Sequence, residues 1–202
     1  MNDIRSMEAL RALYRAPSER AVKKQLERLD EHCRRFISLS PFLVMASADA
    51  EGRVDASPRG GDPGFVKVLD ERTVLIPDAP GNNRLDSMQN LVARPGVGLL
   101  FMIPGVDETL RINGRASLRT DAALVDLCAN ERRRPPLVIA VAVQEAYLHC
   151  AKALMRSRLW DPGAKQERSV LPSMGQMLKD QIGSPGEPES NEAMRERYRA
   201  DL

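Results

Sequence analysis

Short apolar runs separated by turn residues fill the chain between residues 42 and 149, and they constrain its fold more than any other feature. They predict strands at 42–48, 53–57, 66–70, 73–77, 97–103, 108–120 and 137–150, the last being one long or two short strands, with a kink or bulge at Gly114. Only two short helices, 84–93 and 121–129, are predicted between them. A doubly wound parallel sheet would need a helix after nearly every strand. The sequence therefore predicts a small, mostly antiparallel barrel.

The two ends of the chain have a different texture. Residues 5–39 carry apolar residues at helical spacing, interrupted at 16–19, which predicts two helices with the second capped near Ser18. Residues 151–160 are also helical in pattern. From about residue 163 the chain is polar and rich in Pro and Gly, which indicates partial disorder with a terminal helix at 190–200. Three parts are expected: a helical segment 1–34, a barrel 35–162 and a polar extension 163–202.

Charge and cysteine content exclude several classes of protein. The formal net charge is +2, which does not indicate a nucleic-acid partner. The three cysteines are far apart and form no CxxC pair, so a zinc site is not expected, and their odd number fits a reducing cytoplasm. No run approaches the ~18 apolar residues of a membrane helix, so no membrane association is expected.

The stretch DAPGNNRLDSMQNL, residues 78–91, follows one predicted strand and opens a helix. Pro-Gly-Asn-Asn punctuation either only turns the chain or forms a loop that holds an anion at the helix start. In the second alternative, Arg84 at the start of the predicted helix would supply a cation for that anion.

The order of several motifs resembles the pyridoxamine 5′-phosphate oxidase-like FMN-binding split-barrel superfamily over roughly residues 35–162. The motifs are SPRGG, PGNNR, GLLF, ETLRINGRA and HCAKA, in that order. The resemblance implies a mainly β fold with peripheral helices, namely an antiparallel, Greek-key-like split β-barrel. It also implies a homodimer with FMN at the subunit interface.

The resemblance implies that the PGNNR segment binds the FMN phosphate. Gly81 and Asn82 would let the backbone approach the phosphate, while Asn83 would cap the helix or donate to the phosphate. Arg84 would supply a two-pronged cation, and Ser87 lies one turn further on the same face. The alternative is an ordinary capped turn with a surface arginine.

Four further residues are implied flavin contacts. Arg59 is expected on the loop after the second strand, where it would be a second cation. Ser57, the last residue of that strand, would be either a flavin contact or the start of a turn. The oxidase that acts on pyridoxamine phosphate has Arg-Gln-Val-Arg where this chain has ETLR, so Thr109 replaces the glutamine that meets the flavin pyrimidine edge. Arg111 would serve either the flavin or a carboxylate in the dimer.

The segment after the last strand differs from that oxidase. Its Trp-rich substrate strand is absent, and the chain continues as HCAKALMRSRLW. Lys152 and Arg156 would share one helix face and either contact an anion near the flavin or form a solvated basic stripe. Trp160 is expected in the core or an interface, and His149 as a structural histidine with satisfied hydrogen bonds.

Taken together, the residues and the resemblance imply an FMN-binding oxidoreductase that acts on a small molecule but does not oxidise pyridoxamine phosphate. Two alternatives stay open at this point. One is a flavin-binding protein without turnover, and the other is a binder of F420 or heme on the same barrel.

Overall fold

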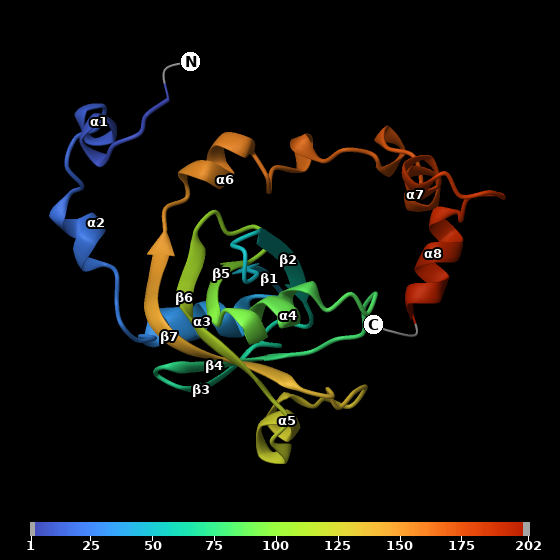
Figure 1. Cartoon of the computed structure of the whole chain (residues 1–202), viewed down its shortest axis with the longest axis horizontal. Helices are drawn as coiled ribbons and strands as arrows, with labels where there is room; N and C mark the ends of the chain where they lie inside the picture. Colours follow the sequence, from blue (N-terminus) through green and yellow to red (C-terminus); the bar gives the residue numbers. More distant parts are fainter. Residues whose placement is uncertain (1–2, 200–202) are drawn as a thin grey trace. The chain divides into compact units, whose positions relative to one another are not determined.

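The structure is a computed structural model that describes residues 3–199, and its centre is one seven-stranded antiparallel sheet (Figure 1). The strand order is β2-β1-β5-β6-β7-β4-β3. The strands are β1 Phe42–Ala48, β2 Val54–Gly60, β3 Lys67–Asp70, β4 Thr73–Pro77, β5 Gly96–Met102, β6 Thr109–Arg119 and β7 Val138–His149. Every pairing is antiparallel, as the sequence predicted.

Eight α-helices accompany this sheet in the part of the chain that the structure describes. They are α1 Met7–Ala12, α2 Glu19–Lys23, α3 Glu31–Leu39, α4 Asp86–Ala93, α5 Ala122–Cys128, α6 Lys152–Ser157, α7 Met174–Ile182 and α8 Asn191–Tyr198. Short 3-10 turns cover Pro162–Ala164 and Arg168–Val170. No helix within residues 3–199 is long and apolar enough to cross a membrane.

The chain divides into two compact units. One comprises residues up to Asp78 together with Leu85–Ala151, and it contains the whole sheet. The other comprises Ala79–Arg84 and the chain from Lys152 onward. The division predicted from sequence, with limits at 34 and 162, stays a prediction.

The inner face of the sheet carries the main hydrophobic core. Side chains alternate between the two faces of a strand, so every second residue points inward. On β5 and β6 these residues are fully buried, as Leu99, Phe101, Leu110 and Ile112 are at most 2% exposed. Helix α3 adds buried apolar residues to the same cluster, namely Cys33, Phe36 and Ile37. A second, smaller cluster joins α5 to β4 and β7, so both faces of β7 are buried near its start.

A bulge separates the two halves of the β6–β7 pair. Asn113 lies opposite Glu145 but Gly114 lies opposite Val143, so Gln144 is the extra residue on β7. A Cβ at Gly114 would overlap the carbonyl oxygen of Ala142. Glycine at this position is therefore required by close backbone approach, and the predicted irregularity is confirmed.

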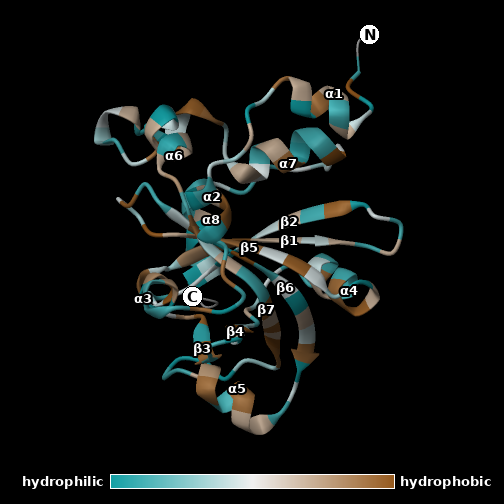
Figure 2. Cartoon of the chain, turned by 90° about the vertical axis from the view of Figure 1, so that its left-hand side faces the viewer, coloured by the Kyte–Doolittle hydropathy of each residue, from teal (hydrophilic) through white to brown (hydrophobic). Residues whose placement is uncertain are grey.

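Several local predictions were wrong. The predicted helix over the second part of residues 5–39 is two helices, α2 and α3, although its start at Ser18 is confirmed: the Ser18 hydroxyl accepts from the N–H of Ala21 at 3.3 Å. Neither α1 nor α2 buries any residue, and Figure 2 shows both hydrophilic and hydrophobic positions on α1. Strand β2 runs three residues further than predicted, through Pro58 to Gly60. Proline is tolerated there because β2 is an edge strand.

Candidate functional site

Ser57 and Arg59 both lie within strand β2, so Arg59 is not on a loop after the second strand as the sequence suggested. Ser57 is opposite Met45 and Arg59 is opposite Leu43, both of which are completely buried. Because directly opposite residues share a face, both side chains lie on the inner face of the edge strand. Both are half-buried. The structure thus brings these two candidates together at the margin of the core.

The guanidinium of Arg59 has a buried atom that is not satisfied by the protein. Its Nε has no hydrogen-bond partner among residues 3–199. A buried polar N–H without an acceptor costs about 1–3 kcal/mol, more for a charged group. An oxygen-rich anionic ligand would supply that acceptor, so the observed environment of Arg59 fits a phosphate or a flavin carbonyl.

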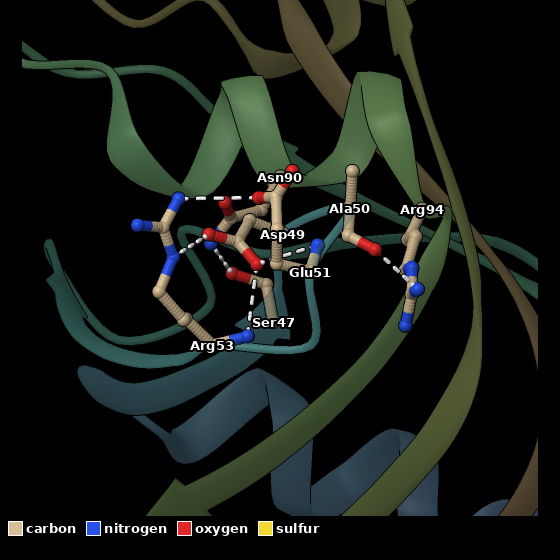
Figure 3. A network of polar contacts seen from close by, with 7 residues as sticks. All are labelled: Ser47, Asp49, Ala50, Glu51, Arg53, Asn90 and Arg94. Atoms are coloured by element: carbon tan, nitrogen blue, oxygen red, sulfur yellow. Dashed lines mark hydrogen bonds and ion pairs between the residues drawn. The ribbon is translucent and has the colours of Figure 1, made fainter.

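Helix α4 is held to the β1–β2 hairpin by polar contacts (Figure 3). The buried Asn90 amide donates to the Ser47 hydroxyl at 3.0 Å, and the Arg94 side chain donates to the carbonyl oxygen of Ala50 at the hairpin turn. One turn before Asn90, the Ser87 hydroxyl donates to the Asp55 carboxylate at 2.8 Å. Asp55 shares the inner face of β2 with the two candidates above, so the hydroxyl of Ser87 is fixed beside that row.

The start of α4 differs from the prediction. The N-cap is Leu85, in a left-handed conformation with φ 57°, and no side chain caps the helix. Asn83 is therefore not the helix cap, because the helix begins three residues after it. The first-turn N–H groups of α4 have no side-chain acceptor at the cap position, which is the arrangement that anions use at helix starts.

The predicted phosphate loop is an ordered turn. The Asn82 side-chain oxygen accepts from the backbone N–H of Arg84 at 3.0 Å. The positive φ in this turn belongs to Asn83, at 58°, and not to Gly81 or Asn82 as expected. Asparagine tolerates this conformation better than most residues. Residues 81–84 are all exposed in the single chain.

Thr109 and Arg111 lie on the outer face of the sheet. Strand β6 pairs with β7 so that Thr109 is opposite His149 and Arg111 is opposite Tyr147. The Arg111 guanidinium carbon is 5.4 Å from the centre of the Tyr147 ring, a cation–π distance. Because Leu110 points inward, these two candidates are on the opposite face from Ser57 and Arg59.

Lys152 and Arg156 begin and nearly end helix α6, as predicted. Both are exposed, and the Arg156 Nε donates to the carbonyl oxygen of Lys152 at 3.0 Å. One of the guanidinium donors of Arg156 is thus already used by the helix itself. The predicted anion contact for these two residues stays a prediction.

His149 departs from the expectation of a satisfied structural histidine. Its Nδ1 is buried and has no hydrogen-bond partner in the described part of the chain. Burial lowers the pKa of the imidazole, and the nearby charges of Arg111 and Lys24 lower it further. Sequence reasoning missed Lys24 and Tyr147, because Lys24 reaches this face across 124 residues of sequence, from the N-terminal segment.

Comparison with solved structures finds similar chains at low identity. A HupZ structure from Group A Streptococcus is 16% identical, covers 59% of this chain and 93% of its own, and gives a TM-score of 0.49. An FMN-binding protein from Syntrophomonas wolfei is 8% identical over 58% of this chain and 83% of its own, with a TM-score of 0.45. HutZ, a heme storage protein from Vibrio cholerae, is 15% identical over 60% and 94%, with a TM-score of 0.41. At these values, no ligand is transferred from these proteins to this chain.

No curated protein matches the sequence. The family model described as pyridoxamine 5′-phosphate oxidase matches residues 29–150, which is more than half of the 202-residue chain. The match spans the whole seven-stranded sheet and both helices inserted in it. The chain belongs to the pyridoxamine 5′-phosphate oxidase family.

Proposed function

We propose that this protein binds FMN and is an oxidoreductase acting on a small molecule. The observation that carries the proposal is the buried, unpartnered Nε of Arg59 at the motif position where the family resemblance implies a flavin contact. A buried guanidinium N–H without an acceptor lowers the stability of the fold. A bound anionic cofactor would supply the missing acceptor.

Each proposed contact has a definite chemical task. Backbone N–H groups and the guanidinium of the segment Gly81–Arg84 would hold the phosphate, with Asn82 and Asn83 shaping the turn. In the sheet unit, Arg59 and Ser57 would bind oxygen atoms of the cofactor, and Ser87 would add a hydroxyl. The Thr109 hydroxyl would meet the flavin pyrimidine edge. FMN itself would supply hydride or electron transfer.

The placement of the candidates supports a homodimer. Among the proposed FMN contacts, Ser57 and Arg59 lie on the inner face of the sheet, whereas Thr109 lies on its outer face. A ligand that contacts both sets can take them from two copies of the chain. We infer a homodimer with FMN at the interface, and sizing of FMN-loaded protein tests this: a tight monomer that retains FMN contradicts it.

We further infer that pyridoxamine phosphate is not the substrate. Thr109 is shorter than the glutamine of the oxidase motif, and the exposed helix α6 follows the last strand in place of a Trp-rich substrate strand. The three cysteines are free thiols, two of them buried, which supports a reducing cytoplasm as the location.

Flavin content of purified variants tests the cofactor. We expect Arg84→Ala and Arg59→Ala each to weaken FMN binding by about ten- to hundredfold, because one charge-assisted contact contributes about 1.5–3 kcal/mol. The matched control is Arg53→Ala, an exposed arginine of the same hairpin whose partners are Asp49 and Glu51. Affinity is measured by titration of FMN into stripped protein.

Several outcomes separate the alternatives. Yellow protein that releases FMN on heating supports the proposal, while unchanged flavin affinity in both arginine variants contradicts the assigned contacts. Colourless protein that takes up F420 but not FMN rejects it. Reduction of the bound flavin by NADH or NADPH, followed by transfer to an acceptor, supports an oxidoreductase. A flavin that neither reductant reduces would leave a flavin-binding protein without turnover.

A further inference from the structure

Two cations lie at cation–π distance from one aromatic ring on the outer face of the sheet. The Lys24 Nζ is 5.5 Å from the centre of the Tyr147 ring, and the Arg111 guanidinium carbon is 5.4 Å from the same point. Tyr147 is directly opposite Arg111, and the next rung toward the strand ends pairs Thr109 with His149. Lys24, Arg111 and His149 are called the outer cluster below.

Lys24 is brought to this face by backbone pairing. Two hydrogen bonds, of 3.0 and 2.8 Å, join Leu26 to Ala146 of β7. Leu29 is fixed in turn by a bond of 2.8 Å from its N–H to the Glu71 carbonyl. The Lys24 ammonium then donates to the carbonyl oxygen of Leu148 at 2.8 Å. Lys24 precedes the region that the family model matches, so it belongs to this chain's own N-terminal segment.

The outer cluster carries positive charge without a carboxylate to balance it. Neither Lys24 nor Arg111 forms an ion pair with any residue in the range 3–199. Glu145 lies on the same face of β7, and its carboxylate accepts from the Asn113 amide at 2.9 Å. By contrast, Arg53 and Arg119 of the sheet unit each donate a hydrogen bond to an aspartate carboxylate.

His149 adds a second, independent observation. Its buried Nδ1 lacks any hydrogen-bond partner among the described residues, although the ring is next to both cations. A neutral imidazole that carries its proton on Nδ1 can donate one hydrogen bond. An oxyanion that reached the ammonium, the guanidinium and this N–H would balance both charges and give the imidazole its missing partner, which no carboxylate among residues 3–199 does.

We propose that the outer cluster binds the oxyanion group, a carboxylate or a phosphate, of a small organic substrate. The term substrate rests on the proposed flavin function, whereas the anion site does not. Lys24 and Arg111 supply the charge and His149 a directed hydrogen bond. The N-terminal segment thereby becomes part of ligand recognition, because its pairing to β7 at Leu26 brings Lys24 close to the cluster.

Histidine NMR tests the site directly, because the chain has only two histidines. His32 is exposed on α3 and serves as the internal reference. Inorganic phosphate and acetate are titrated separately into full-length protein, with and without FMN. We expect the Hε1 signal of His149 to shift with saturation while that of His32 does not, and the probe that saturates at lower concentration identifies the class of oxyanion.

Variants of Lys24 decide whether the cluster is responsible. Lys24→Met is expected to weaken anion binding about tenfold, and Lys24→Arg to restore most of it. The matched control is Lys23→Met, which removes the neighbouring charge, already paired with Glu19 at 2.5 Å, and should change nothing. FMN affinity should be the same in all of these variants, since Lys24 is not a proposed flavin contact.

Three results would overturn the proposal. The first is a His149 signal that neither probe moves, and the second is an equal shift in wild type and Lys24→Met. The third is displacement of FMN by phosphate at the same concentration that shifts His149, since the cluster would then be a cofactor site. If the protein does not bind FMN, the titration of FMN-free protein still tests the anion site. The two proposals can therefore fail independently of each other.

Discussion

The two faces of strand β6 divide packing from chemistry. Leu110 and Ile112 point inward and are completely buried in the core. Arg111 and Asn113 alternate with them on the outer face, half-buried and in contact with Tyr147 and Glu145 of β7. The same backbone thus anchors a hydrophobic core and displays polar groups. On β6, therefore, the inner-face side chains contribute to stability, whereas the outer-face side chains are proposed ligand contacts.

Two adjacent leucines of β5 give the strongest test of this division. We expect Leu99→Ala, on the inner face, to lower the free energy of unfolding by about 2–5 kcal/mol, because it leaves a cavity in a closed core. Leu100→Ala, on the outer face and half-buried, should cost about 1 kcal/mol. Denaturant unfolding measures both. An equal cost that grows with protein concentration would mean that a second copy buries the outer face.

Gly114→Ala tests the bulge, at which the β6–β7 pair changes register. The added methyl group would overlap the Ala142 carbonyl oxygen, so the two strands must move apart. We expect a loss of about 1–3 kcal/mol in the free energy of unfolding, measured by thermal or denaturant melts. Gly96→Ala is the matched control, because a Cβ at that position meets nothing. Equal stability of the two variants would contradict the close approach seen at Gly114.

The smallest effect concerns the pH dependence of the outer face. Burial and two nearby cations hold the pKa of His149 below its ordinary value of 6.5. As the pH falls below 6.5, the unfolded chain takes up a proton at this position before the folded chain does, so stability is lost with falling pH until folded His149 titrates. We expect His149→Gln to lose less stability than wild type between pH 7.5 and pH 5. His32→Gln is the control, and an unchanged slope in His149→Gln would contradict the burial of the imidazole.

The sheet was predictable from sequence because its strands are bounded by clear turn residues. The 42–48 and 73–77 strands agree with β1 and β4 residue for residue. Errors came where local signals conflicted with the tertiary context. Pro58 is a residue type that usually ends a strand, but an edge strand needs no donor on its free side. Leu85 adopts a left-handed conformation at the start of α4, which its residue type does not predict.

The candidate site was only partly accessible to sequence reasoning. Motif order grouped Ser57 with Arg59 and Thr109 with Arg111, but it did not reveal that the pairs lie on opposite faces, because a face depends on register. Lys24 and Tyr147 were missed entirely, since a contact between residues more than one hundred positions apart leaves no local pattern. His149 was noticed but expected to be satisfied, and only burial together with its neighbours shows otherwise.

Pro58 lies in β2, the edge strand at one end of the sheet. A neighbouring molecule that tried to dock there as an additional strand would find a missing amide donor in the middle of the edge. Uncontrolled edge-to-edge growth, the usual route from an open sheet to insoluble aggregates, is thereby discouraged at high concentration. The residue that made the strand hard to recognise is thus a protection against aggregation.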